Sequence, residues 1–267
     1  MLVFPGALLG LFHIENRSID VVWPVVLGLT ITSLIASANY TINEWLDADT
    51  DRFHPEKAVR PAVQGFLNDG LVLLQYACLL TIALILGWRF MGNWFLVVSV
   101  CFVVSGLVYN VKPLRTKDVV IVDILSESMN SPIRLLLGWF CLVDQALPPL
   151  SLILAYWMAG AFLMSIKRYS ELGFIGDREM AGKYRLTFRY YTQEGLLLVA
   201  VFFGLVSYGL LAVFLVQLKA EYSVVLPLVA MLFVWCLRIG LKKGSGAPWS
   251  GALYREARLA PAEKCAC

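Results

Sequence analysis

Seven apolar segments recur along the chain, and each is near the roughly 20 residues that a helix needs to cross a lipid bilayer. They cover residues 20–43, 70–88, 93–110, 119–142, 148–167, 194–217 and 222–240. Backbone polar groups cannot stay unpaired in lipid, so such segments must be helical. A shorter apolar stretch at residues 2–13 indicates a partial first helix. The sequence therefore predicts an all-α, polytopic membrane bundle of about seven full spans and one partial helix.

The composition supports a membrane protein. Hydrophobic residues make up 59% of the 267 residues and charged residues only 15%, whereas soluble domains carry about 25% charged residues. The basic residues lie between apolar segments rather than in a tail, which argues against a nucleic-acid partner. We expect one integral-membrane domain over residues 1–267, with 244–267 forming a loosely ordered tail.

Lysine and arginine are divided unequally between the two sides of the predicted bundle. Eighteen of the 22 lie on one side, and the opposite loops hold only Arg17, Arg89 and Lys219. By the positive-inside rule, the richer side faces the cytoplasm. We therefore expect a polar cap with the active site on the cytoplasmic side, in the inner membrane of a bacterium or archaeon.

The first polar motif lies where the first full span ends. Asn43, Asp47 and Asp51 are four residues apart, so on a helix they follow a single face. Carboxylate and amide oxygens with room for water and phosphate suit Mg²⁺. Lys57 and Arg60 follow, ready for an anion. The alternative interpretation is a solvated acidic helix end followed by a basic loop.

A second polar motif interrupts the segment 119–142. Asp123, Glu127, Asn130 and Arg134 are spaced four, three and four apart, which places them on one helix face. Each charge inside a span costs about 2.5–3.5 kcal/mol on insertion scales, so we expect this stripe to face the bundle interior. The alternative is a ladder of salt bridges that only fixes helix packing.

Two carboxylate pairs at one membrane face predict a site for two or three Mg²⁺ ions that bridge a diphosphate. The predicted catalytic and metal-binding residues are Asp47, Asp51, Asp123 and Glu127, assisted by Asn43. Tyr109, just before the second basic loop, is predicted to bind the diphosphate together with Asn43, and Arg134 is expected to orient Glu127 or the diphosphate. Basic residues of the neighbouring loops complete the predicted diphosphate clamp: Lys57, Arg60, Lys112, Arg115, Lys117 and Lys167.

The loop after the fifth span is rich in lysine and arginine. Lys167 and Arg168 leave that span at the expected mouth of the site, which favours a functional role. Residues 178–192 are amphipathic and basic, a pattern typical of a segment at the headgroup surface. We therefore interpret Arg178 to Arg189 as membrane anchors with snorkelling side chains.

With these motifs, the chain resembles the UbiA-type intramembrane prenyltransferase superfamily over roughly residues 36–190. Three stretches carry the resemblance, and they follow one another in the family's order. They are Asn43-x-x-x-Asp47-x-x-x-Asp51 with Arg60-Pro61, Tyr109-Asn-Val-Lys-Pro-Leu-Arg115-Thr-Lys117, and Asp123-Ile-Leu-Ser-Glu127. Glu44 and Glu127 stand where most members have Asp.

The resemblance implies an all-helical fold around a central cavity with a cytoplasmic cap. It also implies Mg²⁺-dependent transfer of a prenyl group from a prenyl diphosphate to an aromatic or other hydrophobic acceptor in the membrane. Lys167-Arg168-x-x-Glu171 is similar to the branch that transfers phosphoribose to a polyprenyl phosphate, and another branch cyclises its own prenyl chain. Prenyl transfer is our prediction, with these two activities and cation transport as alternatives.

Overall fold

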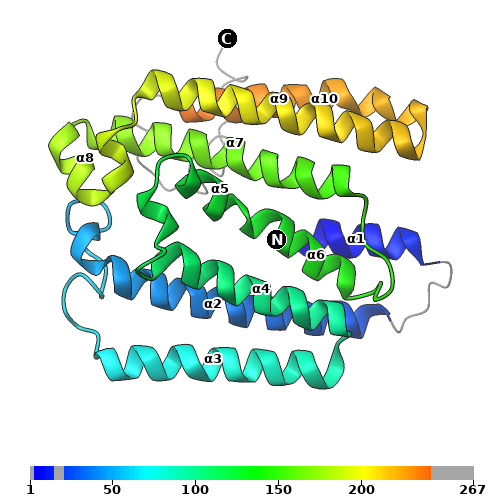
Figure 1. The fold of residues 1–267 in the computed structure, drawn as a ribbon, viewed down its shortest axis with the longest axis horizontal. Coiled ribbons are helices and arrows are strands. Elements are labelled where there is room, and N and C mark those ends of the chain that lie inside the picture. Colours follow the sequence, from blue (N-terminus) through cyan, green and yellow to red (C-terminus); the bar gives the residue numbers. More distant parts are fainter. Residues whose placement is uncertain (1–2, 15–20, 242–267) are drawn as a thin grey trace, which may run out of the picture.

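The computed structural model describes residues 3–14 and 21–241, so the predicted tail at 244–267 lies outside the described residues. The described part is helical throughout (Figure 1). Its α-helices are α1 (Val3–His13), α2 (Val22–Asp51), α3 (Asp69–Phe90), α4 (Asn93–Asn110), α5 (Val122–Ser128), α6 (Asn130–Phe140), α7 (Leu150–Ile175), α8 (Arg178–Tyr184), α9 (Gln193–Leu218) and α10 (Leu226–Leu241). Short 3-10 helices are η2 (Thr116–Asp118), η3 (Leu186–Arg189) and η4 (Ala220–Val225).

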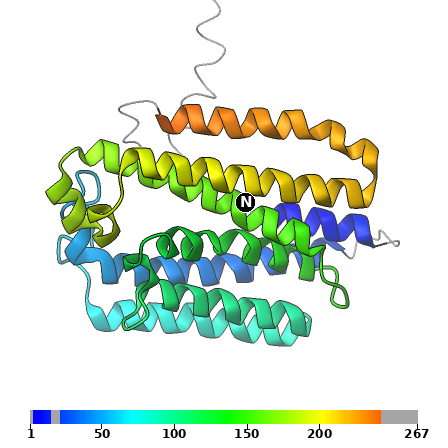
Figure 2. The ribbon, with the colours of Figure 1, turned by 45° about the horizontal axis from the view of Figure 1, so that its top comes forward.

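The long helices run side by side in two groups. Helices α2, α3 and α4 pack together on one side, and α7, α9 and α10 pack together on the other (Figures 1 and 2). Helices α5 and α6 lie between the groups, where α6 contacts α2 and α4 as well as α7. The middle pair therefore connects both halves of the bundle and carries the second polar motif into its interior.

Within the described residues, six helices are long and apolar enough to cross a membrane: α2, α3, α4, α7, α9 and the η4–α10 unit. The segment 119–142, predicted as one continuous span, is instead divided into α5 and α6. The break follows from Pro132, because its ring collides with the carbonyl four residues back and it has no N–H to donate. That carbonyl belongs to Ser128, where α5 ends.

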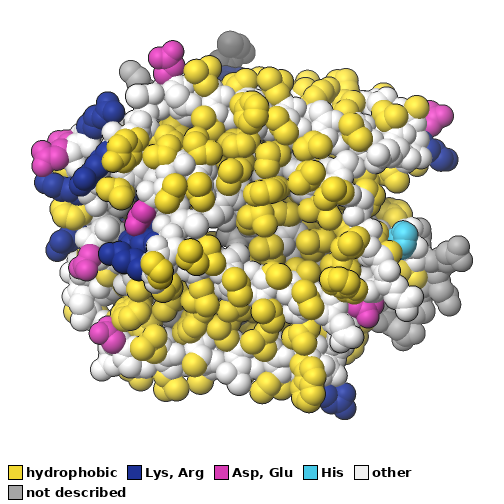
Figure 3. Space-filling model, viewed as in Figure 1, with side chains coloured by type: hydrophobic (Ala, Val, Ile, Leu, Met, Phe, Trp, Pro, Cys, Tyr) yellow, Lys and Arg dark blue, Asp and Glu magenta, His cyan; other side chains and the backbone are white. Residues whose placement is uncertain are grey.

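The surface has the polarity of a membrane protein. Large apolar side chains are exposed along the bundle, among them Trp23 on α2, Trp88 on α3 and Leu205 on α9. In Figure 3 charged side chains gather mainly at the end of the molecule that carries α8, and hydrophobic side chains cover the body between the two ends. The apolar body matches the lipid-facing surface expected of an integral membrane protein.

Helix α1 packs directly against α6 through glycine. A Cβ atom placed on Gly138 would lie 2.0 Å from the carbonyl oxygen of Val3, and one on Gly6 would lie 1.9 Å from that of Leu135. Small residues allow helix backbones to approach closely, and in lipid this packing drives helix association. The partial first helix is thus a structural component of the bundle.

We expect Gly138→Ala to destabilise the protein by about 1–3 kcal/mol, because the added methyl group has no space between the two backbones. Gly209→Ala is the matched control, since a Cβ atom there meets nothing within 4 Å. Thermal unfolding in detergent measures both variants. Equal melting temperatures for the two variants would contradict this account of α1.

Candidate active site

Three loops of the chain meet at the end of the bundle that carries α8. They are residues 52–68 after α2, 111–121 after α4 and 176–192 after α7 (Figure 1). These are the loops in which the sequence concentrates lysine and arginine. Every candidate residue of the two acidic motifs lies at this end or in the adjoining part of the bundle.

A cavity of about 400 Å³, here called the polar cavity, opens between these loops. Six of its lining residues are basic and three are acidic, which gives the cavity a net positive charge. Such a charge suits a ligand with several negative groups. The lining residues are Asp47, Thr50, Asp51, Phe53, Lys112, Arg115, Lys117, Asp118, Gly182, Lys183, Tyr184, Arg185, Leu186 and Arg189.

The first acidic motif forms one wall of the polar cavity. Asp47 forms an ion pair with Lys117 and lies 3.7 Å from Arg115, while Asp51 lies 2.7 Å from Arg60. Lys117 is almost fully buried, and burial lowers its pKa from the usual lysine value. The nearby Asp47 opposes this shift by stabilising the charged amine.

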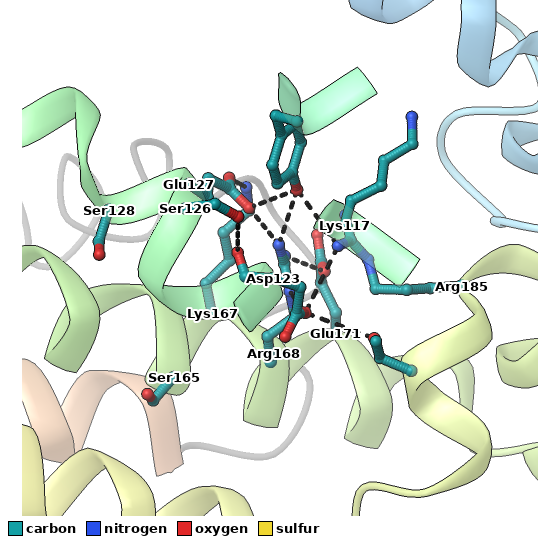
Figure 4. A network of polar contacts seen from close by, with 12 residues as sticks. Lys117, Asp123, Ser126, Glu127, Ser128, Ser165, Lys167, Arg168, Glu171 and Arg185 are labelled. Atoms are coloured by element: carbon teal, nitrogen blue, oxygen red, sulfur yellow. Dashed lines mark hydrogen bonds and ion pairs between the residues drawn. The ribbon is translucent and has the colours of Figure 1, made fainter. Parts of the chain in front are cut away.

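The second acidic motif begins with a carboxylate that has no access to solvent. Asp123 is 0% exposed and accepts hydrogen bonds from Tyr191 (2.5 Å) and Thr187 (3.3 Å). The Arg168 Nε atom lies 3.3 Å from Asp123 and an Arg185 nitrogen lies 3.6 Å from it. Both carboxylate oxygens are therefore occupied by protein donors, of which Figure 4 labels Arg168 and Arg185.

Arg168 is the centre of this buried network. Its guanidinium is also 0% exposed and pairs with Glu127 and Glu171 in addition to Asp123. Glu127 is held a second time by Lys167 at 2.9 Å and accepts a hydrogen bond from Tyr109 at 2.9 Å. Figure 4 shows these side chains converging from α5 and α7. One guanidinium thus contacts three carboxylates, and Lys57, Lys167 and Arg185 supply further positive charge to them.

These contacts decide which acidic residues suit a metal ion. Asp47 and Asp51 line an open, polar cavity, and their oxygens suit Mg²⁺ with room for water and phosphate. Asp123 does not line that cavity, and both of its carboxylate oxygens contact donors of the protein. Among residues 3–14 and 21–241, no group of three or more His, Cys, Asp and Glu side chains is arranged to hold a metal.

A second cavity, here called the lateral cavity, lies between α2, α4, α5 and α6. Its volume is about 120 Å³. Glu127, Asn130 and Arg134 line it together, so three members of the predicted polar stripe share one face and Asp123 does not. The predicted contact between Arg134 and Glu127 is not formed. Instead, the Arg134 guanidinium lies 5.5 Å from the centre of the Phe102 ring.

A short chain of hydrogen bonds separates the two cavities. Asn43 donates to Asn110 (2.6 Å) on the lateral side and to Asp47 (3.3 Å) on the polar side. Lys117 also bonds both Asn110 and Asp47. The partition between the cavities is therefore one layer of polar side chains.

The loop 176–192 differs most from its prediction. Residues 178–192 were expected to form one surface segment, but α8 ends at Tyr184 and the extended backbone of Arg185 (φ −141°, ψ 122°) leads into η3. This break turns Arg185 inward, where its side chain donates to Tyr109 at 3.3 Å. Its predicted role as a membrane anchor is therefore incorrect, and Arg189 also lines the polar cavity.

Some of the predicted clamp residues line one of the two cavities, while Lys57, Arg60 and Lys167 line neither. Arg115 and Lys117 line the polar cavity, as does Lys112. Arg60 holds Asp51, and Lys57 donates to Tyr184 and lies 3.9 Å from Glu171. The other members, Asn43, Tyr109 and Arg134, line the lateral cavity. The residues predicted to clamp one diphosphate are thus distributed over the two adjoining cavities and the loop and helix beside them.

Together, these features define an integral membrane protein with a cationic site at one end of its helix bundle. The chain belongs to the UbiA prenyltransferase family, whose sequence profile matches residues 3–255. Its fold is similar to that of a UbiA homologue from Archaeoglobus fulgidus bound to DMAPP and Mg²⁺. The TM-score is 0.72 at 21% identity, covering 89% of this chain and 83% of that chain.

Two further relatives are informative. The same Archaeoglobus homologue bound to Cd²⁺ matches with a TM-score of 0.72 at 19% identity, over 96% of this chain and 91% of that chain. A decaprenyl-phosphate phosphoribosyltransferase from Mycolicibacterium smegmatis is 29% identical over 159 residues, which is 60% of this chain and 48% of the relative. The chain spans about half the length of the curated relatives it matches.

We expect Arg168→Leu to cost about 3–5 kcal/mol of stability, because it leaves buried carboxylates without their shared cation. Arg178→Leu is the control, since Arg178 is an exposed arginine near the same end of the bundle. Unfolding in mixed micelles compares them. A loss for Arg168→Leu no larger than that for Arg178→Leu would contradict the structural role of this network.

His54 provides a test by pH. It is 5% exposed, packs edge-on against Tyr184 at 4.9 Å and accepts the Glu56 amide at Nδ1. Burial, and then the charge of Lys57, lower its pKa to about 4. The unfolded state therefore binds the proton more readily, and stability should fall as the pH drops from about 6.5 to about 4.

His54→Gln should remove this part of the pH dependence, as measured by melting temperature between about pH 6.5 and about pH 4, the window set by the two pKa values. The variant and the wild type should differ in slope in that window. Parallel profiles across the window would show that His54 titrates normally in the folded protein.

Proposed function

We propose that this chain transfers phosphoribose from phosphoribosyl diphosphate to the phosphate group of a polyprenyl lipid. The observation that carries the proposal is the lining of the polar cavity, where six cations face the ligand space and apolar side chains are few. Phosphoribosyl diphosphate is charged at both ends and bears hydroxyl groups between them. A prenyl diphosphate would instead require an apolar channel leading away from its head group.

Sequence similarity supports the same donor. Curated relatives from two mycobacterial species carry the name decaprenyl-phosphate phosphoribosyltransferase, each at 29% identity over 159 residues. Lys167, Arg168 and Glu171, the stretch that resembles this branch, belong to one buried network. The network fixes α7 beside the loops that line the polar cavity.

The reaction needs one bond to form and one to break. A phosphate oxygen of the lipid forms a bond to C1 of the ribose, while the bond from C1 to the diphosphate oxygen breaks. The diphosphate leaves as an anion, so it requires charge stabilisation more than proton transfer. Arg115, Lys117 and Arg185 line the cavity in which this charge develops.

Mg²⁺ is part of the proposal, through the first acidic motif. Asp47 and Asp51 would hold the ion, with Asn43 positioning Asp47 through its hydrogen bond. When bound, Mg²⁺ would neutralise part of the diphosphate charge, and the cations of the polar cavity would neutralise the rest. Asp123 and Glu127 act differently: they fix Arg168, Arg185 and Lys167, and thereby shape the far wall of the site.

The orientation follows from the donor and from charge. Phosphoribosyl diphosphate is water-soluble and must enter from the end that carries α8, where the polar cavity opens. The lysine and arginine excess of that end favours the cytoplasmic side. We therefore propose an inner-membrane enzyme whose donor arrives from the cytoplasm and whose acceptor arrives from the lipid.

Prenyl transfer is the second candidate. The family bears that name, and the Archaeoglobus homologue has been solved with DMAPP and with GPP. For this chain, a prenyl tail would have to pass from the polar cavity through the partition of Asn43 and Asn110 into the lateral cavity. The donor therefore distinguishes the two candidates.

The test uses the full chain in nanodiscs with Mg²⁺ and a polyprenyl phosphate. We expect label from phosphoribosyl diphosphate to enter the lipid, and no transfer from geranyl diphosphate to lipid or aromatic acceptors. Asp47→Asn should reduce transfer at least about 100-fold, as expected when a group that supports the leaving charge is lost. Glu179→Gln, at an exposed surface carboxylate, should retain full activity.

The opposite donor preference, transfer from geranyl diphosphate and not from phosphoribosyl diphosphate, would overturn the assignment. Full activity of Asp47→Asn would remove the role of the first motif. Both variants should unfold at the wild-type temperature within a few degrees, so that a loss of activity reports on chemistry.

A further inference from the structure

The lateral cavity contains a cation for which no carboxylate partner is present among the described residues. Arg134 lines this cavity from α6, inside an apolar segment, and its Nε atom is buried without a hydrogen-bond partner. Its one described contact with a ring is the face of Phe102. By contrast, Lys117 and Arg168, the two most buried cations of the described chain, both form ion pairs with carboxylates.

A guanidinium in an apolar environment is costly unless an anion or several acceptors satisfy it. The neighbouring carboxylate in the cavity, Glu127, is already held by Lys167 and Arg168 and hydrogen-bonded by Tyr109. Its charge is compensated, so it neither satisfies Arg134 nor strongly repels a second anion. The free donors of Arg134 therefore point to an anionic ligand.

The lateral cavity also reaches the exposed face of α2. Tyr40 lines it and is 69% exposed on α2. Exposed positions continue from Tyr40 along that helix at Ser37, Ser33 and Thr30, which follow one face. The hydroxyl groups of Ser33 and Thr30 donate to backbone carbonyls one turn back. Their hydrogen bonds are therefore satisfied within the helix, and this part of the face can lie against a lipid chain.

We propose that Arg134 binds the phosphate head group of the lipid acceptor in the lateral cavity, with the isoprenoid tail along the exposed face of α2. The identity of the ligand rests on the proposed function, which requires a polyprenyl phosphate. The donor then occupies the polar cavity, and only the layer formed by Asn43, Asn110, Asp47 and Lys117 separates the two substrates.

In this arrangement, each cavity receives the substrate that can reach its opening. The polar cavity opens at the end of the bundle rich in charge, and the lateral cavity opens toward the membrane. The planar guanidinium of Arg134 matches the geometry of a phosphate with two parallel hydrogen bonds. Arg134 is thus a specificity-determining residue for the acceptor, and the donor clamp does not include it.

The test measures binding of radiolabelled farnesyl phosphate to the full chain in phosphatidylcholine nanodiscs, without donor. Wild type should bind it saturably. Arg134→Met should weaken binding by about 10- to 100-fold, as expected for losing charge-assisted hydrogen bonds, and Arg134→Lys should lie between the two. Arg89→Met, which removes an exposed arginine at the far end of α3, should bind like wild type.

Two further measurements separate this role from a structural one. Arg134 has no described ion pair to lose, so Arg134→Met should not lower the melting temperature in the absence of lipid phosphate. Binding of phosphoribosyl diphosphate with Mg²⁺ should also be unchanged in Arg134→Met. A variant that unfolds early, or that loses donor binding to the same extent, would overturn the assignment to the acceptor.

Inorganic phosphate distinguishes a lipid site from a simple anion site. It should displace farnesyl phosphate only weakly, because it lacks the tail. Equal affinity for inorganic phosphate, or wild-type binding of farnesyl phosphate by Arg134→Met, would overturn the proposal. Intact lipid-phosphate binding together with absence of phosphoribosyl transfer would leave this site standing and reject the proposed donor.

Discussion

The site depends on the buried ion pairs of Arg168. Without solvent to screen them, Asp123, Glu127 and Glu171 could not lie close together unless a cation were placed among them. Arg168 supplies that cation from α7, and its contacts tie α7 to α5. Arg185, from the loop 176–192, also pairs with Asp123. The network therefore positions one wall of the polar cavity as well.

This constraint divides the four carboxylates of the two motifs into two kinds by their surroundings alone. Asp47 and Asp51 face open polar space and remain available to a metal ion or a diphosphate. Asp123 and Glu127 form ion pairs with cations of the protein, which is why we propose a positioning role for them. Similar sequence spacing in the two motifs therefore leads to different surroundings, and the proposed function gives ligand binding to the first motif and support of the binding loops to the second.

Much of the fold follows from local sequence. The apolar segments identify the membrane helices. The four-residue spacing of Asn43, Asp47 and Asp51 places these residues on one face of α2, consistent with the hydrogen bond between Asn43 and Asp47. Pro132 was the local signal for the division of α5 from α6. What sequence spacing could not reveal is the pairing of Asp123 with Arg168, which joins residues 45 positions apart.

Arg185 illustrates a different limit. Residues 178–192 were predicted to form one amphipathic segment at the headgroup surface, but α8 ends at Tyr184 and a 3-10 helix, η3, begins at Leu186. The sequence signal for an inward-facing segment was Thr187 and the tyrosines around it. Both Thr187 and Tyr191 turn inward and donate to Asp123. The basic composition of the segment suggested that Arg185 is a membrane anchor, whereas its contacts with Tyr109 and Asp123 make it part of the candidate site.

The most direct test of the account is a cryo-electron microscopy map of the chain in nanodiscs with Mg²⁺ and phosphoribosyl diphosphate. The account predicts density for the donor in the polar cavity, against Arg115, Lys117 and Arg185, with the metal ion at Asp47 and Asp51. Donor density in the lateral cavity, or a metal ion coordinated by Asp123, would contradict it.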